Sequence, residues 1–441
     1  MMPRRILPLL LLAGGLPGAG FAQAPAPLGF AFDTALARRY FREAGELTAR
    51  DAAVLWGRPL GGPLLFVEPR SRALLADSAD PEGRLLALGG FYSGLLPASE
   101  NAANTSLRWA GRTWAMVLWP PPSDSLARAV LLAHELWHRV QDSLGLPSRD
   151  PPNPHLATRD GRLWLRLEGR ALHQALAAAG PARTRALHDA LLFRRTRRRL
   201  FPAADSTERM LELNEGLAEY SGIALTAPDT AARRALVAAR LVALDTVTHY
   251  ERSFAYRTGP AYGFFLDAQA PGWRSTLRAG DDLADLLGAA LGAPAGRRAA
   301  TAVTRAGSYG YPVVRRAETA RATAQRTHLA ALRRRFVSGP SLELPLAEMK
   351  LGFDPGKVET LDSVGTIYGS LRLSDRWGLL QTDGSGGLIS GDWRRLVVPA
   401  PAAEVTSGRR LAGPGWVLEL APGWRLVPGQ RPGDWTVIGG Q

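Results

Sequence analysis

Residues 134–138 read His-Glu-Leu-Trp-His, an HExxH motif that carries the clearest chemical signal in the chain. On a helix, His134 and His138 share one face about 6 Å apart along the axis, so both imidazoles can reach one zinc ion with bonds of about 2.0–2.1 Å. Glu135 lies about 100° further round the helix, where its carboxylate can take a proton from metal-bound water. The motif predicts a hydrolytic zinc site with Glu135 as the general base. The alternative is a pair of histidines that only fill a core helix.

Residues 213–220 offer carboxylates for the same site. They read Leu-Asn-Glu-Gly-Leu-Ala-Glu-Tyr and predict a second helix, with Asn214 near its N-cap. Glu215 and Glu219 are four residues apart and share a face, so one can bind the metal while the other hydrogen-bonds a ligand imidazole. Gly216 suits a close approach to another helix. An ordinary acidic surface helix is the alternative.

Glu168 is a rival third ligand. It lies on the apolar stripe of a helix predicted over residues 160–179, and a buried carboxylate must be paired or neutral. Three roles are open to it: a metal ligand, a group that contacts a ligand histidine or the substrate, or the buried partner of an arginine.

The two motif segments together resemble the gluzincin class of zinc peptidases, which includes thermolysin-like enzymes, aminopeptidases with a WLNEGFA segment and bacterial collagenases. The resemblance rests on HELWH at 134–138 and LNEGLAEY at 213–220. It implies a Zn²⁺ cofactor with three protein ligands, His134, His138 and Glu215.

The same resemblance implies roles for neighbouring residues. Glu135 is the general base, Glu219 hydrogen-bonds a ligand histidine, and Asn214 supports the metal site. Gluzincins also carry an edge strand ahead of the HExxH helix, and the substrate backbone pairs with this strand by β-augmentation. Residues 113–119 match the strand in place, which implies three substrate-binding residues: Trp114, Ala115 and Met116.

A hydrolase of this kind also needs a hydrogen-bond donor for the developing oxyanion. The best candidates lie in residues 253–263, where Tyr256 and Tyr262 stand on either side of a Gly-Pro pair. Either phenol can serve if it projects into the cleft. For each of them, a core aromatic is the alternative.

The surrounding pattern predicts the elements that position these residues. Asp124 or Ser125 can cap a helix that carries the HExxH motif and stops at Gly145. Ahead of it we expect a small sheet whose last two strands form a hairpin. Its predicted strands are 64–67, 72–75, 107–109 and 113–119.

The remaining chain reads in two parts. Residues 123–338 are mainly helical in pattern, and residues 345–441 alternate apolar and polar residues among many Gly, Pro and Trp. We therefore expect an α+β protein with a zincin-like catalytic domain, followed by an all-β module at 345–441. Within the catalytic domain, residues 25–122 form the small N-terminal α/β part and residues 123–338 the helical zinc-binding part.

The first 24 residues predict a secretory signal peptide. Arg4 and Arg5 precede an apolar run, and residues 22–24, Ala-Gln-Ala, provide a cleavage site near Ala24. No later apolar run reaches the roughly 18 residues of a membrane span. We expect an exported protein, periplasmic or extracellular, with no transmembrane segment in the mature chain.

The formal net charge of +14 comes almost wholly from arginine. The basic clusters at 194–199 and 333–335 indicate solvated helix faces, or weak contact with an anionic envelope surface. No nucleic-acid-binding motif is present, so a nucleic acid is not expected as a partner.

These observations predict an exported zinc metallopeptidase that acts on a peptide or protein substrate. Two alternatives are open: a catalytically silent zincin-fold protein of the envelope that serves in binding, and a hydrolase of a non-peptide amide in the cell envelope. Glu135 argues against the silent alternative, because a purely structural metal site does not need that carboxylate.

Overall fold

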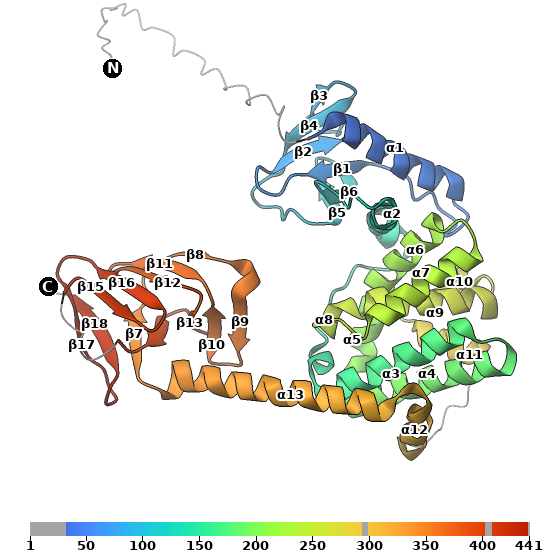
Figure 1. The fold of residues 1–441 in the computed structure, drawn as a ribbon. Helices are drawn as coiled ribbons and strands as arrows, with labels where there is room; N and C mark the ends of the chain where they lie inside the picture. The colour runs from blue at the N-terminus through green and yellow to red at the C-terminus, as the bar shows by residue number, and fades with distance from the viewer. Residues whose placement is uncertain (1–31, 293–298, 402–407, 440–441) are drawn as a thin grey trace, which may run out of the picture. The chain divides into compact units, whose positions relative to one another are not determined.

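The computed structural model describes residues 32–292, 299–401 and 408–439 (Figure 1). The predicted signal peptide, residues 1–24, lies outside the described residues. The chain divides into two compact units. The first contains residues up to 157 together with 164–309, and the second contains residues 158–163 together with those from 310 onwards.

A six-stranded sheet opens the first unit. Its strand order is β3-β4-β2-β1-β6-β5, with β1 parallel to β6 and all other neighbours antiparallel. The strands are β1 (Leu64–Val67), β2 (Ala73–Ala76), β3 (Leu86–Leu88), β4 (Phe91–Leu95), β5 (Thr105–Trp109) and β6 (Arg112–Leu118). The predicted strands are therefore confirmed, and β3 and β4 are added to them.

Strands β5 and β6 form the predicted hairpin. Its two turn residues, Ala110 and Gly111, have φ angles of 50° and 79°. Two left-handed residues in a row are typical of a type I′ turn, whose twist matches that of the strands. Strand β6 also pairs with β1, so it lies inside the sheet and β5 forms the edge. The prediction of residues 113–119 as the edge strand is wrong, because the first strand of the hairpin lies outside the second.

Both faces of β6 are covered. Helices α1 (Thr34–Asp51) and α2 (Ser125–Gln141) pack on the face that carries Ala115. Trp114 and Met116 point to the opposite face, into a separate core cluster. All three side chains are 0% exposed. The prediction of these residues as substrate-binding is wrong, because they form the core on both sides of an interior strand.

The chain from α2 onwards is mainly helical, as predicted. Its helices are η1 (Asp142–Leu144), η2 (Pro154–Ala157), α3 (Arg159–Ala177), α4 (Gly180–Leu200), α5 (Ala204–Leu211), η3 (Glu212–Gly216), α6 (Leu217–Thr226), α7 (Thr230–Ala243), α8 (Tyr250–Ser253), α9 (Ala255–Gln269), α10 (Trp273–Thr276), α11 (Leu283–Ala290), α12 (Ala299–Ala306) and η4 (Gly307–Tyr309). Helix α2 packs against β5 and β6 and also against α6, and α6 packs against α9 (Figure 1). Within the described ranges, none of the helices has the length and apolarity needed to cross a membrane.

In the second unit, helix α13 (Tyr311–Arg333) and its continuation η5 (Arg334–Ser338) lead into two β-sheets. The seven-stranded sheet has the order β17-β18-β7-β14-β13-β10-β9, and the five-stranded sheet has the order β15-β16-β12-β11-β8. Their strands are β7 (Ser341–Pro345), β8 (Lys350–Phe353), β9 (Val358–Leu361), β10 (Gly365–Tyr368), β11 (Leu371–Asp375), β12 (Gly378–Thr382), β13 (Gly387–Ser390), β14 (Arg395–Pro399), β15 (Arg410–Gly413), β16 (Trp416–Leu420), β17 (Trp424–Pro428) and β18 (Trp435–Gly439).

The two sheets share one core that includes Trp377 and Trp416. The predicted β-rich C-terminal region is thus confirmed, although its first strand begins at Ser341 rather than after 345. The boundary between the units lies between 309 and 310, ahead of the boundary expected near 338, because α13 belongs with the sheets.

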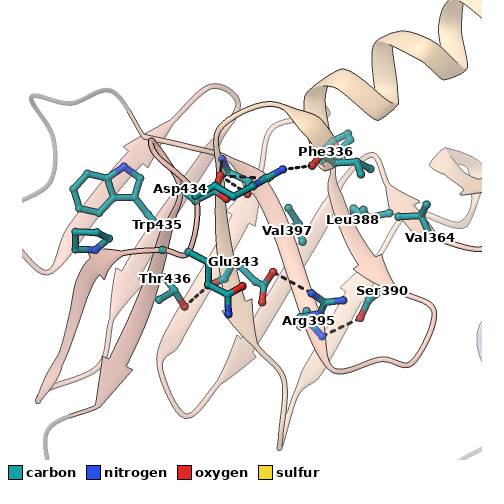
Figure 2. A pocket seen from close by; sticks show the side chains of 16 residues that line it. Phe336, Glu343, Val364, Leu388, Ser390, Arg395, Val397, Asp434, Trp435 and Thr436 are labelled. Carbon is teal, nitrogen blue, oxygen red and sulfur yellow. Dashed lines mark hydrogen bonds and ion pairs between the residues drawn. The ribbon is translucent and has the colours of Figure 1, made fainter.

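A groove of about 610 Å³ lies on the seven-stranded sheet beside Phe336. Figure 2 shows Arg395 in this groove next to Glu343, and the two side chains form a half-exposed ion pair of 3.3 Å. None of the residues that line the groove belongs to the HExxH motif or to residues 213–220.

Candidate metal centre

His134, His138 and Glu215 come together in the first unit. The Nε2 atoms of the two histidines are 3.1 Å apart, and Glu215 Oε2 lies 3.4 Å from His134 Nε2 and 3.7 Å from His138 Nε2. Around a tetrahedral zinc ion with bonds of about 2.0–2.1 Å, two ligand atoms stand about 3.3–3.4 Å apart. The observed distances bracket this value, so the cluster can hold a metal ion of this size. Two imidazoles and a carboxylate suit zinc and other transition metals better than magnesium or calcium.

Helix α2 supplies both histidines. The Asp124 side chain accepts a hydrogen bond of 2.7 Å from the backbone N–H of Ala127, which confirms the predicted cap. Trp137, on the same helix, is fully buried and fixes the rotation of α2 about its axis. This rotation turns both imidazoles towards α6, with their ring centroids 4.8 Å apart.

Glu215 comes from a widened helical turn. Segments α5, η3 and α6 form one continuous helix, and in η3 the N–H of Leu217 bonds the carbonyl of Glu212, five residues earlier. Such single π-turns inside α-helices occur frequently at functional sites. The turn places both Asn214 and Glu215 against α2.

Two glycines let the helices approach each other closely. A Cβ atom on Gly222 would lie 2.6 Å from the carbonyl oxygen of Val130 in α2, and one on Gly216 would lie 3.0 Å from the Cα of Gly259 in α9. Helix α6 therefore packs almost backbone to backbone against α2, and η3 does the same against α9. The predicted close approach at Gly216 is confirmed, and the contact at Gly222 brings the carboxylate of Glu215 within reach of the histidines.

Glu219 lies on the other side of the His134 ring. Its Oε2 is 3.4 Å from His134 Nδ1, and its Oε1 accepts a hydrogen bond of 2.7 Å from Arg240 Nε. Burial alone would lower the pKa of His134, but its hydrogen bonds to Glu215 and Glu219 outweigh burial and raise it to about 10. The two carboxylates thus make this ring strongly basic, as an outer carboxylate does for a metal-bound histidine.

Glu135 lies beside the cluster and is 3% exposed. Within the described part of the chain, its Oε2 atom has no hydrogen-bond partner. Burial raises the pKa of this carboxyl group, although the nearby histidines oppose the shift. A buried polar atom without a partner costs free energy, so its presence in the wall of a cleft indicates a functional role.

Two side chains from the α8–α9 region reach Glu215. The Tyr256 hydroxyl donates to Oε2, and Arg252 donates to Oε1 with a distance of 2.7 Å. Burial and the Glu215 charge raise the pKa of Tyr256, so its phenol stays a protonated donor. The sequence singled out Tyr256 but not Arg252, although Arg252 lies four residues earlier on the same helical face.

Tyr262 and Glu168 belong to a different, fully buried cluster. The Tyr262 hydroxyl donates to Glu168 at 2.7 Å, and Glu168 also pairs with Arg194 and Arg197. The predictions of Tyr262 as an oxyanion donor and of Glu168 beside a ligand histidine are wrong, because neither side chain lines the cleft. The alternative of Glu168 as a buried partner of arginine is confirmed.

The basic segment 194–199 is only partly solvated. Arg194 is 1% exposed and Arg197 is 0% exposed. Arg194 donates to Glu212 of the π-turn, and Arg197 donates to Glu208 of α5. The prediction of a solvated face or an envelope contact is wrong for these two residues, because both guanidinium groups are enclosed. They instead hold the helix that carries Glu215.

The candidate metal cluster opens into a cleft of about 600 Å³. The edge strand β5 lines it through Thr105 and Ser106, preceded by Asn104. On its outer side β5 has no neighbouring strand in the described sheet. An extended chain in the cleft can therefore pair with β5. The sequence predicts this pairing at residues 113–119, most of which lie in β6.

Comparison with known proteins adds no relative: no protein-family model, curated protein or solved structure matches the chain. A functional assignment therefore depends on the residues of the centre and their geometry.

Proposed function

We propose that this protein is an exported zinc metallopeptidase of the gluzincin type. One observation carries the proposal: His134, His138 and Glu215 stand at metal-ligand distances beside Glu135, a buried carboxylate with no hydrogen-bond partner for Oε2 among the described residues. A purely structural zinc site is closed by four protein ligands. Among the residues that the structure describes, this cluster has three and borders a cleft, which supports a catalytic centre.

The chemistry follows from the positions of these side chains. Zinc bound here would lower the pKa of a bound water towards about 7 and polarise the scissile carbonyl. Glu135 accepts the proton of the attacking water and returns it to the leaving amine, and a raised pKa suits a base that works near neutral pH. Tyr256 is the candidate donor to the developing oxyanion: its hydroxyl lines the cleft beside the ligand cluster, and it would turn its one hydrogen from Glu215 Oε2 to the oxyanion.

The surroundings of the cleft support a peptide as the substrate. A sheet whose edge strand β5 borders the cleft packs directly on the HExxH helix, and this arrangement supports a zincin-like fold. A peptide in extended conformation can add to β5 through main-chain hydrogen bonds, and this brings its scissile bond to Glu135.

The decisive test is zinc analysis of the purified protein together with a peptide-library digest. We expect one zinc per chain in the wild type and in Glu135→Gln, because Glu135 is not a ligand. The variant should lose at least about 10²-fold in kcat, the usual contribution of a general base. Glu82→Gln, at an exposed carboxylate of the same unit, serves as the matched control.

Unchanged turnover in Glu135→Gln would overturn the proposal. A wild-type protein that binds zinc but cleaves no peptide would instead favour the silent binding protein or the hydrolase of a non-peptide amide.

A further inference from the structure

Gln141 and Asn214 lie between two of the proposed metal ligands. His138 Nδ1 is 2.8 Å from Gln141 Oε1, Gln141 Nε2 is 3.0 Å from Asn214 Oδ1, and Asn214 Nδ2 is 3.1 Å from Glu215 Oε1. Both amides are buried, with exposures of 1% for Gln141 and 3% for Asn214. Three hydrogen bonds thus connect a histidine of α2 to the carboxylate of η3 through two side-chain amides.

This chain of hydrogen bonds can run in only one direction. A carboxylate accepts hydrogen bonds and cannot donate them, so Asn214 must present its NH₂ group to Glu215. Its carbonyl then faces Gln141, which must present its own NH₂ group in turn. The Gln141 carbonyl is left to face His138 Nδ1, and that nitrogen must carry the proton.

The neighbouring donors fix the same direction. Arg252, which has donors only, gives a second hydrogen bond to Glu215 Oε1. Ser148 Oγ lies 3.2 Å from Asn214 Oδ1 and donates to it. Turning both amides over would set two acceptors against each other at Glu215. It would also move the His138 proton to Nε2, the atom that points at the metal-binding cluster.

We propose that Gln141 and Asn214 are positioning residues that set the tautomer of His138. The acceptor-only carboxylate of Glu215 defines the direction, and the two amides carry it to the histidine on the other helix. The Nε2 lone pair of His138 is thereby directed at the cluster before a metal binds. This inference rests on the proposed metal site and adds Gln141 and Asn214 as determinants of its affinity.

The first test measures the zinc dissociation constants of Gln141→Leu, Asn214→Leu and the double variant by competition with a chromophoric chelator. Each single variant should bind zinc about 10–100-fold more weakly, as is usual when an outer partner of a metal ligand is removed. The double variant should be no weaker than the weaker single one, because either change breaks the whole chain. Ser143→Ala, at an exposed serine near the end of α2, is the matched control with unchanged affinity.

The second test reads the tautomer directly in the metal-free protein by ¹⁵N NMR of labelled histidines. His138 should carry its proton on Nδ1 in the wild type, and this preference should be lost in Gln141→Leu. Gln141→Glu should restore it, because a carboxylate still accepts from Nδ1. Denaturant unfolding of the metal-free variants separates a tautomer effect from a general loss of structure.

Several outcomes would overturn the inference: additive losses in the double variant, an unchanged zinc dissociation constant in the single variants, or an Nε2–H tautomer in the wild type. None of these readouts requires peptide hydrolysis. If the protein binds zinc but cleaves no peptide, the proposed function fails while this inference stands. If zinc binds and the amide variants match the wild type, only the inference fails.

Discussion

The phenol ring of Tyr256 lies parallel to the imidazole of His134, with 5.6 Å between the ring centroids and 3° between the ring planes. The hydroxyl of the same tyrosine donates to Glu215 Oε2, the oxygen that faces both histidines. One side chain therefore packs against one proposed ligand and hydrogen-bonds another. Its hydroxyl lines the cleft beside Glu135, which supports the proposed role as oxyanion donor.

Tyr256→Phe keeps the stacked ring and removes only the hydroxyl. We expect kcat for a peptide substrate to fall by about 10²–10³-fold, the usual effect of losing one oxyanion donor, with a much smaller change in KM. Steady-state kinetics measures kcat and KM, and zinc titration checks that the variant still binds the metal. Tyr262→Phe is the matched control: it should keep kcat but lose about 1–3 kcal/mol of unfolding free energy, because buried Glu168 loses a donor. Equal kcat values for wild type and Tyr256→Phe would exclude the assigned role.

Zinc affinity should depend steeply on pH. The two carboxylates around His134 raise its pKa from 6.5 to about 10, so a proton must leave this ring before zinc binds. Between pH 6.5 and 8.5 the apparent association constant should rise by about tenfold per pH unit for this one proton. Calorimetry in buffers of different ionisation enthalpy counts the protons released. Release of no proton at pH 7 would contradict the prediction.

The stability of the metal-free protein should fall as the pH rises, whereas the zinc affinity should increase. A histidine whose pKa is raised on folding stabilises the folded state fully below its unfolded value of 6.5, and this contribution is lost as the pH rises towards 10. Denaturant titrations of the metal-free protein at several pH values check this. His134→Gln, which cannot titrate, should remove this part of the pH dependence.

Gly222→Ala should weaken metal binding from a distance. The new Cβ would lie 2.6 Å from the Val130 carbonyl oxygen, so α6 must move away from α2 and take with it Glu219 and, on the adjoining η3, Glu215. We expect a loss of about 1–3 kcal/mol in unfolding free energy and a clear loss of zinc affinity. Gly45→Ala is the matched control in α1, where a Cβ meets nothing within 4 Å. Wild-type zinc affinity in Gly222→Ala would show that the close contact between α2 and α6 is not needed for metal binding.

Arg194→Met should destabilise the first unit. It leaves Glu212 and Asp282 buried with fewer cationic partners, and breaking a buried ion pair on one side costs about 3–5 kcal/mol. Arg84→Met, which removes an exposed ion pair with Glu82, should change stability very little. The two variants are compared by denaturant unfolding. Similar stabilities would mean that the buried network contributes no more than a surface pair.

Local rules were sufficient for much of the site. The HExxH helix, its Asp124 cap and the hairpin turn at Ala110 and Gly111 depend on residues within a few positions of one another, and all three follow from the sequence. The cluster of His134, His138 and Glu215 was expected from two motifs and from a resemblance, which together related residues that are distant along the chain.

Other features of the site depend on packing between segments that are distant in sequence, so the sequence alone did not predict them. Which strand of the hairpin pairs with β1 depends on the whole sheet, so the edge position of β5 was missed. Glu168 fits an apolar stripe equally well beside a metal or beside arginines, and only the fold distinguishes these environments. Gln141, Arg240 and Arg252 belong to no motif, and they gain a role only because helices far apart in sequence meet at the cluster.

The π-turn of η3 has one more consequence. Glu212 on this turn is tied to Arg194 in the interior, whereas Glu215 on the same turn faces the histidines. A regular helix would bring side chains three apart onto neighbouring sides, and the wider turn separates them. Contacts on two different sides of the helix therefore fix its rotation about its own axis. Inserting or deleting a single residue between Glu212 and Glu215 would release one of the two carboxylates from its partners, so the spacing of this pair should tolerate less variation than the residues between them.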